Sequence, residues 1–213
     1  MPTLKSLELI KKLIAFDTTS RESNLELIAF IQDYLSDFSI DSLLVHNKEG
    51  TKANLYATLG ESNKSGIMLS GHTDVVPVDG QNWDTNPFKA TEINANLYGR
   101  GTADMKSFIA VALAYVPVFL NQKLKTPIHF AFSYDEEIGC IGVRRLIEKL
   151  KEMPIKPAMC IVGEPTSMKV VTGHKGKRSF YVNVRGLESH SALAPQGVNA
   201  VEYAAELVAF LKK

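Results

Sequence analysis

The chain has 213 residues, of which 45% are hydrophobic and 22% charged, and its 24 Lys and Arg against 23 Asp and Glu leave a net charge of +1. This composition is ordinary for a globular protein, and so small a net charge argues against nucleic acid or a membrane surface as a partner. The apolar run at residues 108–120 is too short to span a bilayer, and residues 1–16 lack the uninterrupted apolar core of a signal peptide. Since two cysteines make no disulfide framework, we expect a cytoplasmic protein.

Apolar residues recur at helical spacing from Leu4 to Ile14, so we expect the chain to open with an amphipathic helix. Short apolar runs then alternate with amphipathic segments. The predicted elements, in chain order, are helix 4–14, helix 23–38, strand 42–45, strand 54–59, strand 66–71, loop 75–88, helix 104–121, strand 128–134, helix 143–151 and strand 158–162. This order is typical of an α/β fold, and it predicts a mainly parallel sheet with helices on both faces.

The pattern changes toward the end of the chain. Residues 169–186 are polar and alternating, as in strands, most clearly at 179–184, and residues 199–213 have helical periodicity. We therefore expect a first domain over residues 1–170 and the incomplete start of a smaller α+β domain over residues 171–213.

One histidine and five carboxylates stand at the ends of predicted strands or helices. They are His72 and Asp74 after strand 66–71, Asp104 at the start of helix 104–121, Glu136 and Glu137 after strand 128–134, and Glu164 after strand 158–162. Because ligands bind outside the carboxyl ends of the strands in an open parallel sheet, we expect these side chains to converge on one edge.

Carboxylates crowded around one imidazole repel each other unless cations hold them, so the set predicts two divalent metal ions, with zinc the first choice and cobalt also suitable. Asp74 points to the same side of an extended chain as His72, and is placed to accept the proton of its second ring nitrogen. Glu136 and Glu137 point to opposite sides, so we expect one to bind metal and the other to act as a general base.

Each of these residues also has an ordinary explanation when it is taken alone. Asp104 is a good helix N-cap, and a lone His72 is most often a hydrogen-bonded loop residue. Residues 99–104 lack the third glycine of a dinucleotide loop and the Lys-Ser/Thr of a phosphate loop. The joint placement of the acidic residues and the histidine therefore favours a metal site.

The chain resembles the M20 family of metallopeptidases and deacylases. The matching motifs occur in the family's order and lie at Ser70–Pro77, Tyr98–Lys106, Asp135–Gly139 and Gly163–Thr166. The resemblance implies a catalytic domain followed by a lid domain that also forms a homodimer.

The resemblance also implies a role for each site residue. One metal ion would be held by His72 and Glu164, with Asp104 as the bridge to a second ion held by Glu137. Glu136 would be the general base, Asp74 the partner of His72, and the peptide bond after Asp104 would be cis. His190 matches a lid-domain histidine that reaches the substrate carbonyl across the dimer.

The resemblance implies hydrolysis of the amide of a small N-acyl amino acid. The sequences of the segments Thr102–Ser107 and Tyr134–Gly142 are most similar to those of family members that convert N-acetylornithine to ornithine and acetate in arginine biosynthesis. Succinyl-diaminopimelate or a dipeptide is the alternative substrate, and a non-catalytic metal-binding or dimerising fragment is the alternative of another class. Family members run to nearly twice this length and receive a final metal-binding histidine from a later segment, so we expect a fragment or a truncated protein.

Overall fold

The computed structural model describes residues 2–61 and 63–212. The chain forms two compact units, Met1–Lys169 and Val170–Lys213, which we call the first and the second unit. Within the described residues, no helix is both long enough and apolar enough to cross a bilayer.

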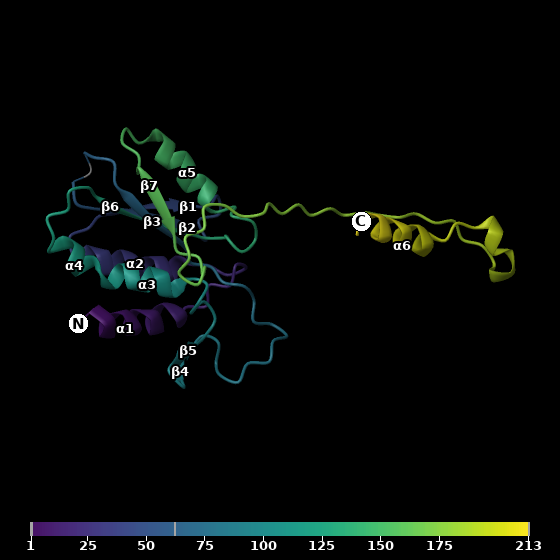
Figure 1. Ribbon diagram of the computed structural model, residues 1–213, viewed down its shortest axis with the longest axis horizontal. Helices are drawn as coiled ribbons and strands as arrows, with labels where there is room; N and C mark the ends of the chain where they lie inside the picture. Colours follow the sequence, from purple (N-terminus) through teal and green to yellow (C-terminus); the bar gives the residue numbers. More distant parts are fainter. Residues whose placement is uncertain (1, 62, 213) are drawn as a thin grey trace. The chain divides into compact units, whose positions relative to one another are not determined.

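A five-stranded sheet forms the centre of the first unit, with strand order β1-β2-β6-β3-β7 (Figure 1). The strands are β1 (Ser42–His46), β2 (Ala53–Leu59), β3 (Ile67–His72), β6 (Ile128–Ser133) and β7 (Met159–Val162). β3 runs parallel to both β6 and β7, whereas β2 runs antiparallel to both β1 and β6. The predicted α/β class is confirmed, but the sheet is mixed and not mainly parallel, because β2 opposes both of its neighbours.

Helices cover both faces of this sheet, as predicted (Figure 1). They are α1 (Pro2–Ile14), α2 (Leu25–Ser36), α3 (Lys106–Ala114) and α4 (Val116–Leu120) on one side, and α5 (Val143–Glu152) on the other. Side chains alternate along β6, so that Phe130 and Phe132 face the larger core beneath α2 and α3, while Ala131 packs with Leu146 of α5. The sheet is thus held between two unequal apolar layers.

The long helix predicted at residues 104–121 is instead two helices, with the break at Tyr115. Pro117 lies in the first turn of α4, where a residue without a backbone N–H is tolerated, whereas in a continuous helix it would remove a hydrogen bond. The hairpin of β4 (Thr91–Ile93) and β5 (Asn96–Tyr98) was not predicted. Its turn residues, Asn94 and Ala95, both have positive φ without the glycine that signals such a turn in a sequence.

The second unit contains the short helix η1 (Ser191–Gln196) and α6 (Ala200–Leu211), and a single bridge pairs Leu187 with Val198. The helix predicted at residues 199–213 is confirmed over Ala200–Leu211, while residue 213 lies outside the described residues. The Asn199 side chain caps this helix by accepting a hydrogen bond from the Val201 N–H at 3.1 Å. The strands predicted within residues 169–186 are wrong, since the described residues form no strand there. Alternation alone makes no strand without a partner that satisfies its backbone groups.

Candidate metal centre

His72 is the last residue of β3, and its ring is buried, with 2% of the side chain exposed. It pairs with Ser133 at the end of the parallel strand β6, so the chain that leaves β6 toward Glu136 starts beside it. Glu164 follows β7, the other parallel neighbour of β3. The parallel half of the sheet therefore delivers the histidine and two carboxylates to the same edge.

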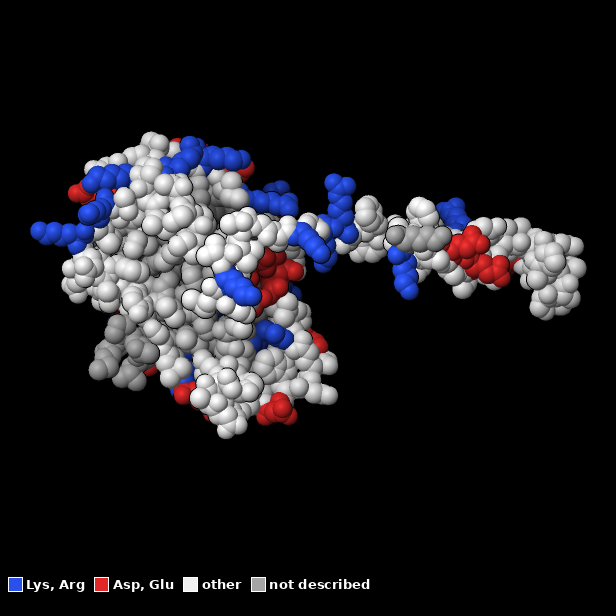
Figure 2. All heavy atoms as spheres, viewed as in Figure 1, with Lys and Arg blue, Asp and Glu red and all other residues white. Residues whose placement is uncertain are grey.

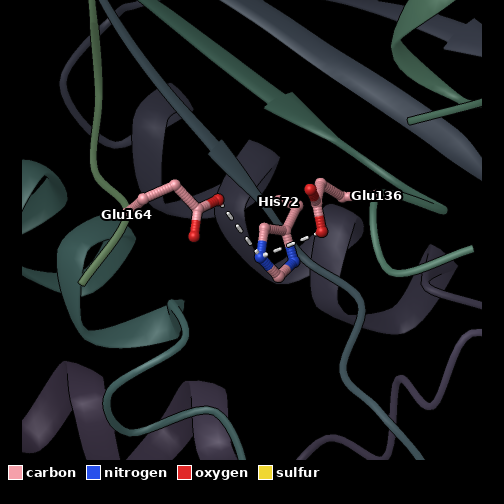
Figure 3. A group of neighbouring side chains, drawn as sticks. All are labelled: His72, Glu136 and Glu164. Atoms are coloured by element: carbon pink, nitrogen blue, oxygen red, sulfur yellow. Dashed lines mark ion pairs between the residues drawn. The ribbon is translucent and has the colours of Figure 1, made fainter. Parts of the chain in front are cut away.

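Three carboxylates surround the Nε2 atom of His72. The nearest oxygen of Asp104 lies 2.9 Å away, that of Glu164 3.6 Å and that of Glu136 3.8 Å. Figure 3 shows that Glu136 and Glu164 approach the ring from opposite sides. The carboxylate of Asp104 does not cap α3, whose N-cap residue is Met105 and which has no side-chain cap. Asp104 therefore faces the histidine rather than the helix.

Asp74 holds the residues of this edge together. Its carboxylate accepts hydrogen bonds from the Ser20 hydroxyl at 2.7 Å and from the backbone N–H groups of Glu136 and Glu137 at 3.0 and 3.2 Å. The Nδ1 atom of His72 lies 2.9 Å from the backbone oxygen of Asp74 and 3.5 Å from its carboxylate. Nδ1 thus faces Asp74 as expected, with the backbone oxygen as the closer partner, and Nε2 is left to face the acidic residues.

Burial and crowding shift the pKa values of these groups. Burial favours the neutral ring of His72, but its contacts with Asp74 and Asp104 outweigh that effect and raise the pKa of His72 to about 10. Burial raises the pKa of both Glu137 and Glu164, and the nearby carboxylate of Asp104 raises both further. The ionised forms of Glu137 and Glu164 are therefore less favourable here than in water.

The ligand atoms fit metal ions. Two groups of side chains each have ligand atoms within 4.8 Å of one another, and both groups include His72. One group adds Glu136 and Glu164, and the other adds Asp104 and Glu137. Imidazole nitrogen with carboxylate oxygens is a donor set that zinc and cobalt accept, and a divalent cation would offset the burial and the neighbouring carboxylates that raise the pKa values of Glu137 and Glu164. The residues present therefore fit a metal centre. On the face drawn in Figure 2, a group of acidic side chains lies in a hollow of the first unit.

Metal binding should be coupled to proton release. A metal ligand must be a neutral imidazole, whereas His72, with a pKa of about 10, carries a proton at neutral pH. We expect the affinity for Zn²⁺ to rise about tenfold per pH unit from about pH 6 to about pH 8, with at least one proton released per ion. Isothermal titration calorimetry in buffers of different ionisation enthalpy measures both quantities. An affinity that does not change with pH would contradict the protonated state of His72.

No role was predicted from the sequence for four residues that contact the edge of the sheet at His72 or the segments behind it: Ser20, Lys52, Lys106 and Asp135. The side chain of Lys106 is fully buried, and its Nζ donates to the backbone oxygens of Leu13 at 3.2 Å and Phe16 at 2.8 Å. Burial lowers the pKa of Lys106 to about 7, against the opposing effect of Asp17 and Asp74. A single cation at the start of an apolar helix was the signal that could have revealed it.

His190 lies in the second unit, where its exposed side chain accepts a hydrogen bond from the Ala192 N–H at 3.2 Å. Its role at the substrate stays a prediction. The peptide bond between Asp104 and Met105 is cis, as expected from the family motif.

Known proteins match this chain along most of its length. Residues 68–213 match Peptidase family M20/M25/M40. The acetylornithine deacetylase of Buchnera aphidicola subsp. Acyrthosiphon pisum is 36% identical over 204 residues, which are 92% of this chain and 52% of that protein. The acetylornithine deacetylase of Vibrio cholerae serotype O1 is 36% identical over 214 residues, which are 98% of this chain and 55% of that protein. The chain thus spans about half the length of the curated relatives it matches.

A solved structure extends the likeness to the fold. The crystal structure of a tripeptidase from Staphylococcus aureus matches with a TM-score of 0.69 and covers 97% of this chain and 56% of its own. At 18% identity, that similarity shows the fold alone. The motif match and the identity to curated relatives go further than a common fold, and this chain belongs to the peptidase family M20/M25/M40.

Proposed function

We propose that this chain carries the metal centre of a two-metal amidohydrolase that removes the acyl group from an N-acyl amino acid, with N-acetylornithine as the substrate. The observation that carries the proposal is the cluster of four carboxylates, those of Asp104, Glu136, Glu137 and Glu164, around His72 at one edge of the sheet. Many hydrolytic enzymes bind two metal ions in one such cluster of side chains.

The side chains divide between metal binding and proton transfer. His72 and Glu164 would hold one ion, Glu137 the other, and Asp104 would bridge them. Zinc is the first choice for both ions and cobalt the second. Once bound, such ions polarise the amide carbonyl and activate water.

Glu136 is the general base of this proposal. Its backbone N–H donates a hydrogen bond to Asp74, while its side chain is 36% exposed and so accessible to a substrate. The carboxylate takes a proton from the attacking water and returns it to the amine that leaves. His190 of a second copy would contact the oxygen of the same carbonyl, as the family motif implies.

Two observations support a small acyl group. The curated relatives at 36% identity are named acetylornithine deacetylase. A cavity of about 170 Å³ lies beside Asp104 and Glu137, and a cavity of roughly this size accommodates a molecule such as benzene. An acetyl group is smaller than benzene and fits this space.

The remaining proposals follow from family membership. Residues 1–170 would belong to the catalytic domain and residues 171–213 would begin a lid domain through which two copies pair. The reaction would serve arginine biosynthesis in the cytoplasm. One observation favours a second candidate, a metal-binding fragment without activity, because the chain covers only 52–55% of its curated relatives.

A direct assay separates these candidates. The 213-residue protein, loaded with Zn²⁺ or Co²⁺, should release acetate from N-acetylornithine faster than it cleaves succinyl-diaminopimelate or a dipeptide, and a chelator should lower the rate at least about 100-fold. Metal analysis runs in parallel. Two bound ions without hydrolysis of any of the three substrates would favour the inactive fragment, and the absence of tight metal binding would remove the proposal altogether.

A further inference from the structure

A closed ring of hydrogen bonds lies behind the metal centre. Lys52 donates from Nζ to the carboxylate of Asp135 at 2.6 Å and to the backbone oxygen of Ser20. The Ser20 hydroxyl donates to Asp74, which in turn accepts the backbone N–H of Glu136, the residue that follows Asp135. The ring therefore joins four segments of the chain that are far apart in sequence.

The turn that carries both glutamates is attached to this ring at two points. Asp135 has a positive φ of 55°, a conformation that a residue with a side chain seldom adopts without support. Beyond it, the Gly139 and Cys140 N–H groups both donate to the backbone oxygen of Glu136 at 2.8 and 2.9 Å. The turn is thus braced internally, and its orientation depends on where Asp74 and Lys52 hold it.

The ion pair in the ring is well shielded from water. The side chains of Lys52 and Asp135 are 13% and 10% exposed, whereas the ion pair of Lys64 with Glu61 leaves its partners 54% and 70% exposed. A shielded pair loses little to solvent screening, and the loss of one partner leaves a charge poorly solvated. Neither Lys52 nor Asp135 is within the candidate ligand groups.

We propose that Lys52 and Asp135 are positioning residues, whose ion pair orients the turn that presents Glu136 and Glu137 to the metal centre. The inference rests on the proposed function for its effect on turnover, but the effect on the turn itself needs no substrate. Neither side chain transfers a proton or binds metal in this proposal. Lys52 holds the carboxylate of Asp135, and this contact keeps the next two residues against Asp74.

The first test measures the turn in the metal-free protein. Lys52→Met removes the charge and keeps a long unbranched side chain, and Asp135→Asn removes the other charge at nearly constant volume. In either variant we expect amide hydrogen exchange at Glu136 and Glu137 to become at least about tenfold faster, while the β6 amides are unchanged. Lys64→Met is the control, because it removes an exposed lysine and should leave exchange at the turn unchanged.

The second test measures turnover of N-acetylornithine by the metal-loaded protein. Lys52→Met should lower kcat about 10- to 100-fold with KM nearly unchanged, because the base acts in the transition state rather than in binding. Lys52→Arg, which keeps the charge, should recover most of the loss. In the double variant Lys52→Met/Asp135→Asn, the second substitution should add far less than it costs alone.

The outcomes separate this inference from the proposed function. If Lys52→Met and Asp135→Asn leave exchange at Glu136 and Glu137 as in the unaltered protein, the positioning role is wrong whatever the activity. If exchange at the turn accelerates in a protein that hydrolyses no N-acyl amino acid, the positioning role of Lys52 and Asp135 is supported and the proposed function is wrong. An additive double variant would show that the two residues act separately, against the inference.

Discussion

Replacing Glu136 with Gln should lower kcat about 10²- to 10⁴-fold, and the protein should keep its full metal content. The amide has the size of the carboxylate but cannot accept a proton from water. Because the backbone N–H of Glu136 and not its side chain contacts Asp74, the substitution leaves the turn attached. Steady-state rates with N-acetylornithine and metal analysis of the same sample measure both quantities.

Glu137→Gln is the matched control for this experiment, because it makes the same chemical change one residue later. Glu137 belongs to the ligand group with His72 and Asp104, so its loss should release one ion and reduce activity through that release. The opposite result, with Glu136→Gln losing metal and Glu137→Gln keeping it, would exchange the two roles. Glu136 lies close enough to His72 and Glu164 to make that outcome a real test.

The second large effect concerns stability, where His72 and Lys106 should oppose each other. The pKa of His72 rises from 6.5 to about 10 on folding, so its stabilisation is complete below pH 6.5 and is lost as pH rises through 10. The pKa of Lys106 falls from 10.5 to about 7, so folding gains stability as pH rises from 7 toward 10.5. Each slope is on the order of 1 kcal/mol per pH unit, with opposite sign.

We therefore expect the metal-free protein to have nearly constant stability from about pH 7 to about pH 9 as far as these two groups are concerned. Lys106→Met should make stability fall with pH, and His72→Gln should make it rise, each by about 1 kcal/mol per pH unit. Denaturant titrations with a chelator present, followed by the fluorescence of Trp83, the sole tryptophan and part of the first unit, measure the slopes. Parallel curves for all three proteins would contradict both pKa shifts.

Apolar periodicity predicted the strands of the five-stranded sheet and most helices of the first unit, because each of these segments buries an apolar face. It could not predict the direction of β2. That strand is buried along nearly its whole length, on both faces, so it resembles a strand of a parallel sheet although both of its neighbours run the other way. Direction depends on which strands pair, and pairing leaves no trace in the pattern of a single strand.

The position of the site could be predicted because its ligands follow the ends of strands. The residues that support these ligands could not. Ser20 and Lys52 lie in connecting segments with no motif, and their importance comes from a hydrogen-bond ring that exists only in the folded chain. Lys106 is different, since its charge beside an apolar helix was visible, but its partners are backbone oxygens more than 80 residues away.

The place of β3 between β6 and β7 sets an order of events during synthesis. Its two neighbours, β6 and β7, are both made after it, so His72 leaves the ribosome well before Glu137 and Glu164. A nascent chain that stops short of Glu137 contains neither complete ligand group, and contacts between such distant segments form slowly. A metal ion at the group of His72, Asp104 and Glu137 would therefore have to wait for β6, and one at the group of His72, Glu136 and Glu164 for β7 as well.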